Sequence, residues 1–318
     1  MSTDDLEDDL TRRTENAPQE LATRSFFFLC AALSIATTLS IVVLLTTEAA
    51  KFFDLTAPLM DVTGETVSIV QFLTGTEWNI QGEQFGVLAL VSATILVTVG
   101  SAVVAIPLGT ATAIYLSEYA SPELRSLLKP ALEILAGVPT VVYGFFALKY
   151  VTPALKVFFP SIEFFNLASA SILVGILIIP MVASISEDAM SAVPDELRQA
   201  GYGMGATKFE VSTGIVVPAA ISGIISSFIL AISRAIGETM IVVVAAGSQA
   251  KFLPLLPSSY LDGALPMTAA MVKLLTGDIT GGGLAYRSLF AIGLTLFFIT
   301  LAMNVISDLI ARHYREEY

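Results

Sequence analysis

The chain has 318 residues, of which 55% are hydrophobic and only 14% charged, and its mean hydropathy is +0.78. Soluble globular domains carry about 25% charged residues, so this composition excludes a soluble fold and indicates an integral membrane protein. The net charge of −12 provides no basic surface for nucleic acid. Cys30 is the single cysteine and His313 the single histidine, which excludes an internal disulfide, a histidine-based metal site and a histidine-dependent triad. We therefore expect no metal and no cofactor.

An acidic, polar tail precedes a series of long apolar segments. Residues 1–24 are rich in Thr, Asp and Glu, which predicts a disordered cytoplasmic tail, and residues 25–318 are expected to form one membrane domain. A helix needs about 20 apolar residues to cross the hydrocarbon core of a bilayer. The predicted fold class is therefore all-α, a polytopic membrane protein with six transmembrane helices. The six segments are Phe26–Leu45, Phe85–Leu116, Ala131–Leu148, Leu167–Ser186, a helix within Val211–Ala250, and Ser288–Ser307.

The distribution of Lys and Arg between the loops predicts the orientation of these helices. The segments that are cytoplasmic when the N-terminus lies inside contain more of these cations than the segments on the other side. Trp78 also lies near the predicted outer interface, where amphipathic rings concentrate. We expect a multi-pass protein of the cell membrane with both termini in the cytoplasm.

Two of the connecting segments carry signals for short helices. Ser121 is placed to cap a helix whose first turn contains Pro122 and Glu123, and Pro130 is expected to end it before the third span. In the last outer loop, Met267–Leu275 is predicted to form two turns of helix that lie on the outer surface or dip into it.

The segment of about residues 187–218 is predicted to form a compact helix–turn–helix on the cytoplasmic face. Asp195 follows a proline and suits the first turn of a helix, and Gly205 suits the left-handed residue that closes it. Thr207 and Glu210, three residues apart, fit a capping box that starts a second helix.

The fifth apolar run contains two charges, Arg234 and Glu238. A charged side chain at the centre of a span costs about 2.5–3.5 kcal/mol on insertion scales, so two of them need compensation. Their i, i+4 spacing predicts that they share a helix face, although Arg before Glu is the poorer order for local support. Gly237 between them permits close backbone approach or a break. We interpret this pair as a place where a polar solute binds or crosses; the alternative is a structural pair that holds helices together.

The cytoplasmic segment resembles the coupling loop of ABC importer permeases. The family pattern is Glu-Ala-Ala, three residues, Gly, nine residues, Ile, one residue, Leu-Pro. The matching residues here are Gln199, Ala200, Gly201, Gly205, Ile215, Val217 and Pro218, with Gln, Gly and Val as the departures. Further motifs recur in order at Thr74–Asn79, Ala113–Tyr119, Leu135–Phe146 and Ser233–Met240. Over about residues 25–310 the chain resembles PstC, the family of permease subunits of phosphate ABC importers.

This resemblance implies an ABC importer type I permease fold and a non-catalytic role. It also implies a heterodimer with a second, PstA-like permease, two ATP-binding subunits on the cytoplasmic face, and an extracytoplasmic phosphate-binding protein. In the family the coupling loop docks in a cleft of the ATPase subunit. Lys208 lacks the Gly-Lys-Ser/Thr context of a phosphate-binding loop, so ATP is expected on a separate subunit.

The resemblance also points to Arg234 and Glu238, with Gly237 between them, as part of the phosphate path. We expect Arg234 to attract the anion and Glu238 to accept a hydrogen bond from a protonated phosphate oxygen, which sulfate lacks near neutral pH. Glu133 either pairs with Arg234 or extends to the interface. Thr140 and Tyr143 either line the path or pack against lipid and core.

Three other functions remain open at this point. A permease for another oxyanion, such as sulfate or molybdate, would share the coupling loop. A stand-alone, ion-coupled transporter would need no ATPase subunit. A membrane enzyme is disfavoured, because the chain has no His, Cys or clustered carboxylate chemistry for it.

Overall fold

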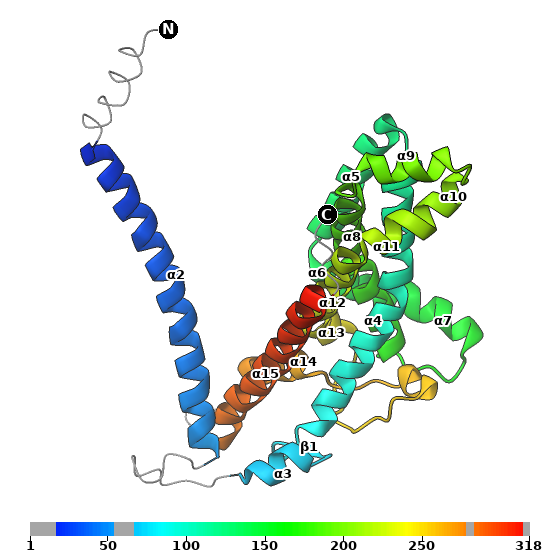
Figure 1. Cartoon of the computed structure of the whole chain (residues 1–318). Helices are drawn as coiled ribbons and strands as arrows, with labels where there is room; N and C mark the ends of the chain where they lie inside the picture. Colours follow the sequence, from blue (N-terminus) through cyan, green and yellow to red (C-terminus); the bar gives the residue numbers. More distant parts are fainter. Residues whose placement is uncertain (1–16, 54–66, 278–282, 314–318) are drawn as a thin grey trace.

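The computed structural model describes residues 17–53, 67–277 and 283–313, and this part of the chain is almost entirely helical (Figure 1). The α-helices are α2 Ala17–Phe52, α3 Ile69–Thr74, α4 Leu88–Ile114, α5 Pro122–Gly137, α6 Thr140–Phe146, α7 Thr152–Phe158, α8 Leu167–Ser191, α9 Asp195–Gly203, α10 Lys208–Val211, α11 Val217–Ala219, α12 Ile221–Ile236, α13 Met240–Ala245, α14 Met267–Thr276 and α15 Leu284–His313. Three π-helical turns, Tyr115–Tyr119, Ala147–Val151 and Ser212–Val216, join neighbouring helices, and Pro257–Leu261 is a 3₁₀ turn. Strands β1 (Trp78–Asn79) and β2 (Gln84–Phe85) form a short antiparallel hairpin.

Five helical segments within the described residues are long and apolar enough to cross a membrane. They are Glu20–Phe52, Leu88–Tyr119, Thr140–Phe158, Leu167–Ser191 and Leu284–Ser307. A sixth crossing is formed if the bent pair Lys208–Ala219 and Ile221–Ile236, which changes direction by 70°, is one span. The all-α, polytopic fold predicted from composition is confirmed.

The third span begins later than the apolar pattern predicted. We expected a helix over Ala131–Leu148, but α5 ends at Gly137, and Val138 and Pro139 are not helical. Proline disfavours helical backbone angles in the residue before it, so Pro139 divides the apolar run. The crossing segment is Thr140–Phe158 instead.

Helix α5 starts as predicted but continues further. The Ser121 hydroxyl accepts a hydrogen bond from the Leu124 N–H at 3.3 Å, which caps the first turn. The predicted end before Pro130 is wrong, because the helix runs on through this residue to Gly137. Pro130 is exposed, so the backbone carbonyl that it leaves without a helical partner can be solvated.

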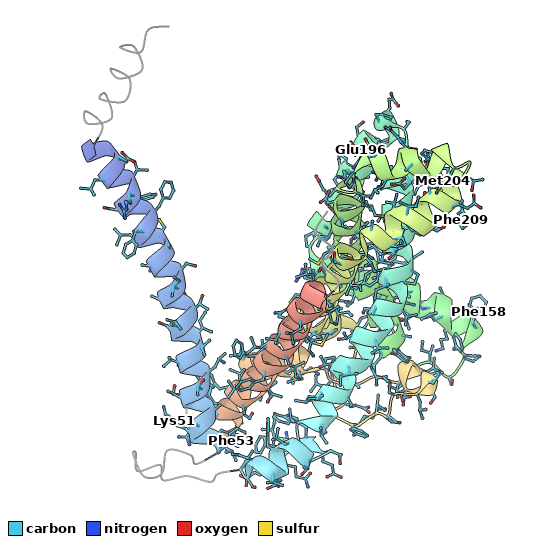
Figure 2. The ribbon with its side chains drawn as sticks, in the orientation of Figure 1. Lys51, Phe53, Phe158, Glu196, Met204 and Phe209 are labelled. Atoms are coloured by element: carbon cyan, nitrogen blue, oxygen red, sulfur yellow. The ribbon has the colours of Figure 1, made fainter. Side chains whose placement is uncertain are left out.

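Helix α2 leads the chain into the bundle and also corrects the predicted tail. Its first residue is Ala17, so residues 17–24, predicted to be disordered, are helical, and residues 1–16 lie outside the described residues. Along most of its length α2 is exposed and diverges from the other helices (Figure 1). Its C-terminal end, marked by Lys51 in Figure 2, packs beside the start of α15.

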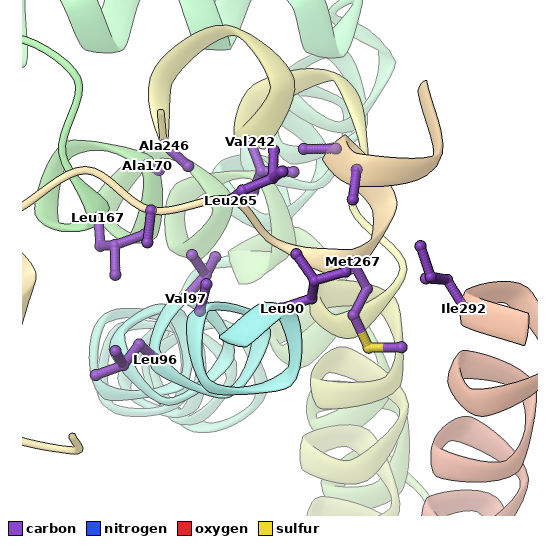
Figure 3. Close-up of a cluster of buried hydrophobic side chains, with 14 of the residues drawn as sticks. Leu90, Leu96, Val97, Leu167, Ala170, Val242, Ala246, Leu265, Met267 and Ile292 are labelled. Atoms are coloured by element: carbon purple, nitrogen blue, oxygen red, sulfur yellow. The ribbon is translucent and has the colours of Figure 1, made fainter. Parts of the chain in front are cut away.

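Helices α4 and α8 form the centre of the bundle and contact each other closely. A Cβ atom added at Gly109 would lie 2.6 Å from the Val182 side chain, and one at Gly175 would lie 2.8 Å from Val104. Small residues at such crossings let the two backbones approach, which is how helices pack in membranes. Side chains from α4, α8, α13, α14 and α15 then meet in one buried cluster (Figure 3).

The hairpin and α14 pack at the end of the bundle where α4 begins. Trp78 is buried against Phe85 in an edge-to-face contact, with 5.4 Å between ring centroids. The helix predicted at Met267–Leu275 is confirmed as α14, Met267–Thr276. Its first residues are buried between α4, α13 and α15, so α14 is packed into the protein rather than laid on its surface.

Candidate functional site

Arg234 and Glu238 do not lie side by side on one helix face. Arg234 is in the last turn of α12 and is exposed in the single chain, whereas Glu238 follows the end of that helix and is 4% exposed. One Glu238 carboxylate oxygen accepts hydrogen bonds from the N–H groups of Met240 (3.1 Å) and Ile241 (3.3 Å). The described part of the chain contains no ion pair between the two residues. The expected mutual neutralisation is therefore corrected: Glu238 caps α13 instead.

The cause is a break between α12 and α13 at residues 237–239. Of the two roles predicted for Gly237, close backbone approach or a break, the structure shows the break: α12 ends just before this residue. The Gly237 carbonyl accepts a hydrogen bond from the Thr239 hydroxyl at 3.1 Å. The Glu238 N–H donates to the Ala235 carbonyl at 3.1 Å, and its own carbonyl accepts from the Thr268 hydroxyl at 2.7 Å. Irregular backbone within a membrane protein persists where its polar groups find such partners.

Arg234 lines a cavity of about 550 Å³ between the end of α4, α5, α8 and α12. Charged residues of both signs line it, namely Lys129, Glu133, Asp188 and Arg234. Within the described residues Arg234 makes no ion pair, and Glu133 faces the same cavity without approaching Arg234 within 4 Å. A guanidinium that is not paired inside the protein remains available to an anion.

Thr140 and Tyr143 do not line this cavity. The Tyr143 side chain is buried, and its hydroxyl donates to the Leu135 carbonyl at 2.7 Å. This bond joins α6 to the end of α5 across the break at Pro139. Of the alternatives left open for Tyr143, packing in the core fits the structure, while Thr140 is half-buried at the start of α6.

An ion-pair cluster that sequence reasoning missed joins α5 to the end of α8. Glu187 of α8 is fully buried and contacts the side chains of Arg125 and Lys129, which lie one turn apart on α5. Ser191 donates to the Glu187 carboxylate at 3.2 Å and accepts from Arg125 at 3.0 Å. We call Arg125, Lys129, Glu187 and Ser191 the α5–α8 clamp. The i, i+4 pair of cations on α5 was its only signal in the sequence.

The predicted helix–turn–helix follows directly and has the expected local structure. Helix α9 ends at Gly203, and Gly205 two residues later has a φ of +85°. The N–H groups of Gly205 and Ala206 donate back to the carbonyls of Tyr202 (3.0 Å) and Gly201 (3.2 Å). The capping box between Thr207 and its partner three residues later is complete. Both local predictions are confirmed.

Gly201, one of the three departures from the family pattern, is buried against the second helix of the loop. A Cβ atom there would lie 2.6 Å from the Ile215 side chain and 3.0 Å from Val211. Glycine therefore lets α9 pack closely on the segment that leads into α12. Gln199, Ala200 and Pro218 are exposed, so they leave this part of the surface free for a partner.

Arg198 fixes α9 to the rest of the bundle, a role that the sequence did not reveal. Its guanidinium pairs at 3.1 Å with the buried Glu118, in the π-helical turn that follows α4, and at 3.1 Å with Asp195 of α9 itself. It also donates to the carbonyls of Met190 (2.8 Å) and Val193 (2.6 Å) at the end of α8. Three of these acceptors, Glu118, Met190 and Val193, lie outside α9, so Arg198 couples α9 firmly to the segments at the ends of α4 and α8.

Large apolar side chains are exposed at the tip of this unit. Met204 is 84% exposed and Phe209 67% exposed, and both project from the end of the molecule in Figure 2, with Tyr202 also exposed. Exposed apolar groups gathered on a structured unit are typical of a protein–protein contact.

Comparisons with known proteins agree with this architecture. Residues 105–316 match the family described as binding-protein-dependent transport system inner membrane component. The chain is 31% identical to the probable ABC transporter permease protein YqgH of Bacillus subtilis, over 96% of this chain and 93% of that protein. It is 32% identical to the phosphate transport system permease protein PstC of Mesorhizobium japonicum, over 74% of this chain and 76% of that protein. A crystal structure of a bacterial ABC transporter involved in alginate import shares the fold, with a TM-score of 0.60 at 13% identity over 98% of this chain and 99% of that chain.

These findings confirm the resemblance to ABC importer permeases and to PstC that the ordered motifs indicated. Proteins of this kind are membrane translocation components that work with other subunits of a transporter. The chain belongs to the family of binding-protein-dependent transport system inner membrane components, the permeases of ABC importers.

Proposed function

We propose that this chain is one of two permease subunits of an ATP-driven importer of inorganic phosphate. In this proposal residues 25–318 form the permease domain and pair with a PstA-like permease. Two ATP-binding subunits bind on the cytoplasmic face, where both termini lie, and an extracytoplasmic phosphate-binding protein delivers the substrate. Similarity to PstC relatives over about three quarters of the chain supports phosphate as the substrate.

The observation that carries the proposal is the Arg234 guanidinium on the wall of the cavity. Guanidinium groups present several N–H donors in a plane and bind phosphate oxygens in pairs. Since Arg234 is exposed in the single chain and makes no ion pair within the described residues, binding an anion does not require it to leave a protein partner.

Glu238 takes a different part in the proposal from the one its spacing suggested. Through its bonds to the first N–H groups of α13 it fixes the break after Gly237, and Arg234 lies one turn before that break. We proposed that Glu238 rejects sulfate by accepting a hydrogen bond from a protonated phosphate oxygen. Such a contact would use the Glu238 carboxylate oxygen that does not cap α13.

ATP-driven motion would enter through the helix–turn–helix. Met204 and Phe209 are proposed to insert into a cleft of the ATPase subunit. Because Arg198 connects α9 to the ends of α4 and α8, movement of α9 would carry those ends with it. The α5–α8 clamp would then transmit the movement to α5, which forms one wall of the cavity.

The test is phosphate uptake by the whole complex, purified with its co-expressed neighbouring subunits and reconstituted in vesicles loaded with ATP. The variant Arg234→Gln is expected to lower uptake about 10- to 100-fold, because a hydrogen bond to a charged group contributes about 1.5–3 kcal/mol. The matched control is Arg24→Gln, which removes an exposed arginine from α2. Uptake that is unchanged in Arg234→Gln would contradict the assignment.

A second candidate substrate is another oxyanion, because an arginine also binds sulfate or molybdate. Labelled sulfate offered to the same vesicles separates the two. If sulfate uptake is saturable and unlabelled phosphate does not compete with it, the substrate is sulfate rather than phosphate. Phosphate uptake in vesicles without ATP, driven by a proton gradient alone, would instead indicate an ion-coupled transporter.

A further inference from the structure

The break between α12 and α13 is held by a residue from a distant part of the chain. Thr268, in the first turn of α14, is 6% exposed, and its hydroxyl donates to the Glu238 carbonyl at 2.7 Å. This carbonyl lies outside both helices, so the bond comes from tertiary structure. It places α14 directly against the segment that presents Arg234.

The N-terminus of α14 is itself fixed to the central helix of the bundle. The Met267 N–H donates to the Thr94 hydroxyl at 2.9 Å, and Thr94 in turn donates to the Leu90 carbonyl of its own helix at 2.9 Å. Figure 3 shows Met267 next to Leu90 in the buried cluster. Thr268 is therefore held between α4 and the break rather than free to change its position.

The segment that leads into α14 ties it to the outer loops. The N–H groups of residues 263–265 donate to the Glu163 carboxylate (2.8 Å), the Ala246 carbonyl (2.9 Å) and the Gln249 carbonyl (3.0 Å). A displacement of these loops is thus passed along the backbone to Thr268, and through one hydrogen bond to Glu238.

We propose that Thr268 is a positioning residue for transport: its hydroxyl holds the Glu238 carbonyl so that the turn carrying Arg234 faces the anion path. This rests on the proposed function, in which Arg234 binds the anion. Without the hydroxyl the break relaxes and the guanidinium is no longer fixed when ATP-driven closure occurs. The complex then hydrolyses ATP without moving a matching amount of phosphate.

The experiment compares three single variants of the reconstituted complex. Thr268→Val removes the hydroxyl at nearly constant volume, and Thr268→Ser retains it. The matched control is Thr98→Val, because Thr98 is also buried (7% exposed). Among the described residues its hydroxyl bonds only to the Thr94 carbonyl of its own helix, at 2.8 Å. The measured quantity is phosphate imported per ATP hydrolysed, together with the amount of assembled complex.

Thr268→Val is expected to lower this ratio about two- to tenfold, the range that one hydrogen bond covers. Thr268→Ser and Thr98→Val should stay close to the parent complex. The inference is overturned if the ratio is unchanged in Thr268→Val, if transport and ATP hydrolysis fall together in proportion to the amount of complex, or if Thr98→Val lowers the ratio equally. A parent complex that imports no phosphate would refute the proposed function instead, so the two failures are distinct.

Discussion

Replacing both cations of the α5–α8 clamp is expected to destabilise the protein more than replacing the carboxylate that they hold. In Arg125→Gln/Lys129→Gln the fully buried Glu187 loses both ion-pair partners that contact it. Breaking a buried ion pair in this direction costs about 3–5 kcal/mol, because an uncompensated charge stays inside. In Glu187→Gln the two cations remain, and since their side chains are 37% and 35% exposed they can be hydrated. That cost should be about 1 kcal/mol.

The assay is the thermal midpoint of the purified complex, followed by fluorescence in detergent. The unfolding entropy is about 2.1 cal/mol/K per residue, so for 318 residues 1 kcal/mol shifts the midpoint by about 1.5 °C. The double variant should therefore lose about 4–8 °C and Glu187→Gln about 1–2 °C. Adding Glu187→Gln to the double variant removes the buried charge and should restore part of the loss. The reasoning is refuted if the double variant is no less stable than Glu187→Gln, or if the triple variant recovers nothing.

Two further predictions concern the helix–turn–helix and the start of α5. Gly205→Ala places a Cβ on a residue with a φ of +85° and should lower the stability of the protein by about 1–2 kcal/mol. The control Gly203→Ala lies within α9 with open space around it and should be neutral or stabilising in the same thermal assay. Equal effects of the two variants would contradict the requirement for a left-handed residue at position 205. Hydrogen bonds from the Glu123 N–H and the Ser121 hydroxyl lower the pKa of the Glu123 carboxyl in the folded protein. The stability that this carboxylate contributes is therefore fully present above the pKa of the unfolded chain, and it is lost as the pH falls through the lower pKa of the folded protein. The deficit of Ser121→Ala should therefore stay constant from pH 7 down to about pH 4.5 and shrink as the pH falls further. A deficit that does not change below about pH 4.5 would rule this coupling out.

Local structure was predictable wherever the deciding contacts lie within a few residues along the chain. The capping box at Thr207, the left-handed Gly205 and the cap at Ser121 each depend on neighbours in sequence, and all three occur as predicted. Pro139 also acts locally, and the third span was misplaced because hydrophobicity was given more weight than the restriction a proline puts on the preceding residue.

The relation between Arg234 and Glu238 was mispredicted because helical periodicity was carried across a break. Once the chain leaves α12 at Gly237, the carboxylate finds the N–H groups of α13 within reach, and these compete successfully with a guanidinium one turn away. The partner that stabilises the break, Thr268, comes from another helix, so no spacing in the sequence announces it.

By itself, the sequence determined that this protein is a helical membrane permease with a structured helix–turn–helix between two spans, because apolar length, helix caps and ordered motifs depend on consecutive residues. Only the tertiary structure decided which charges meet. Glu187 pairs with two cations of α5, and Arg198 with the end of α4. Burial makes such pairings strong, and burial is a property of the packed bundle that neighbouring residues alone do not specify.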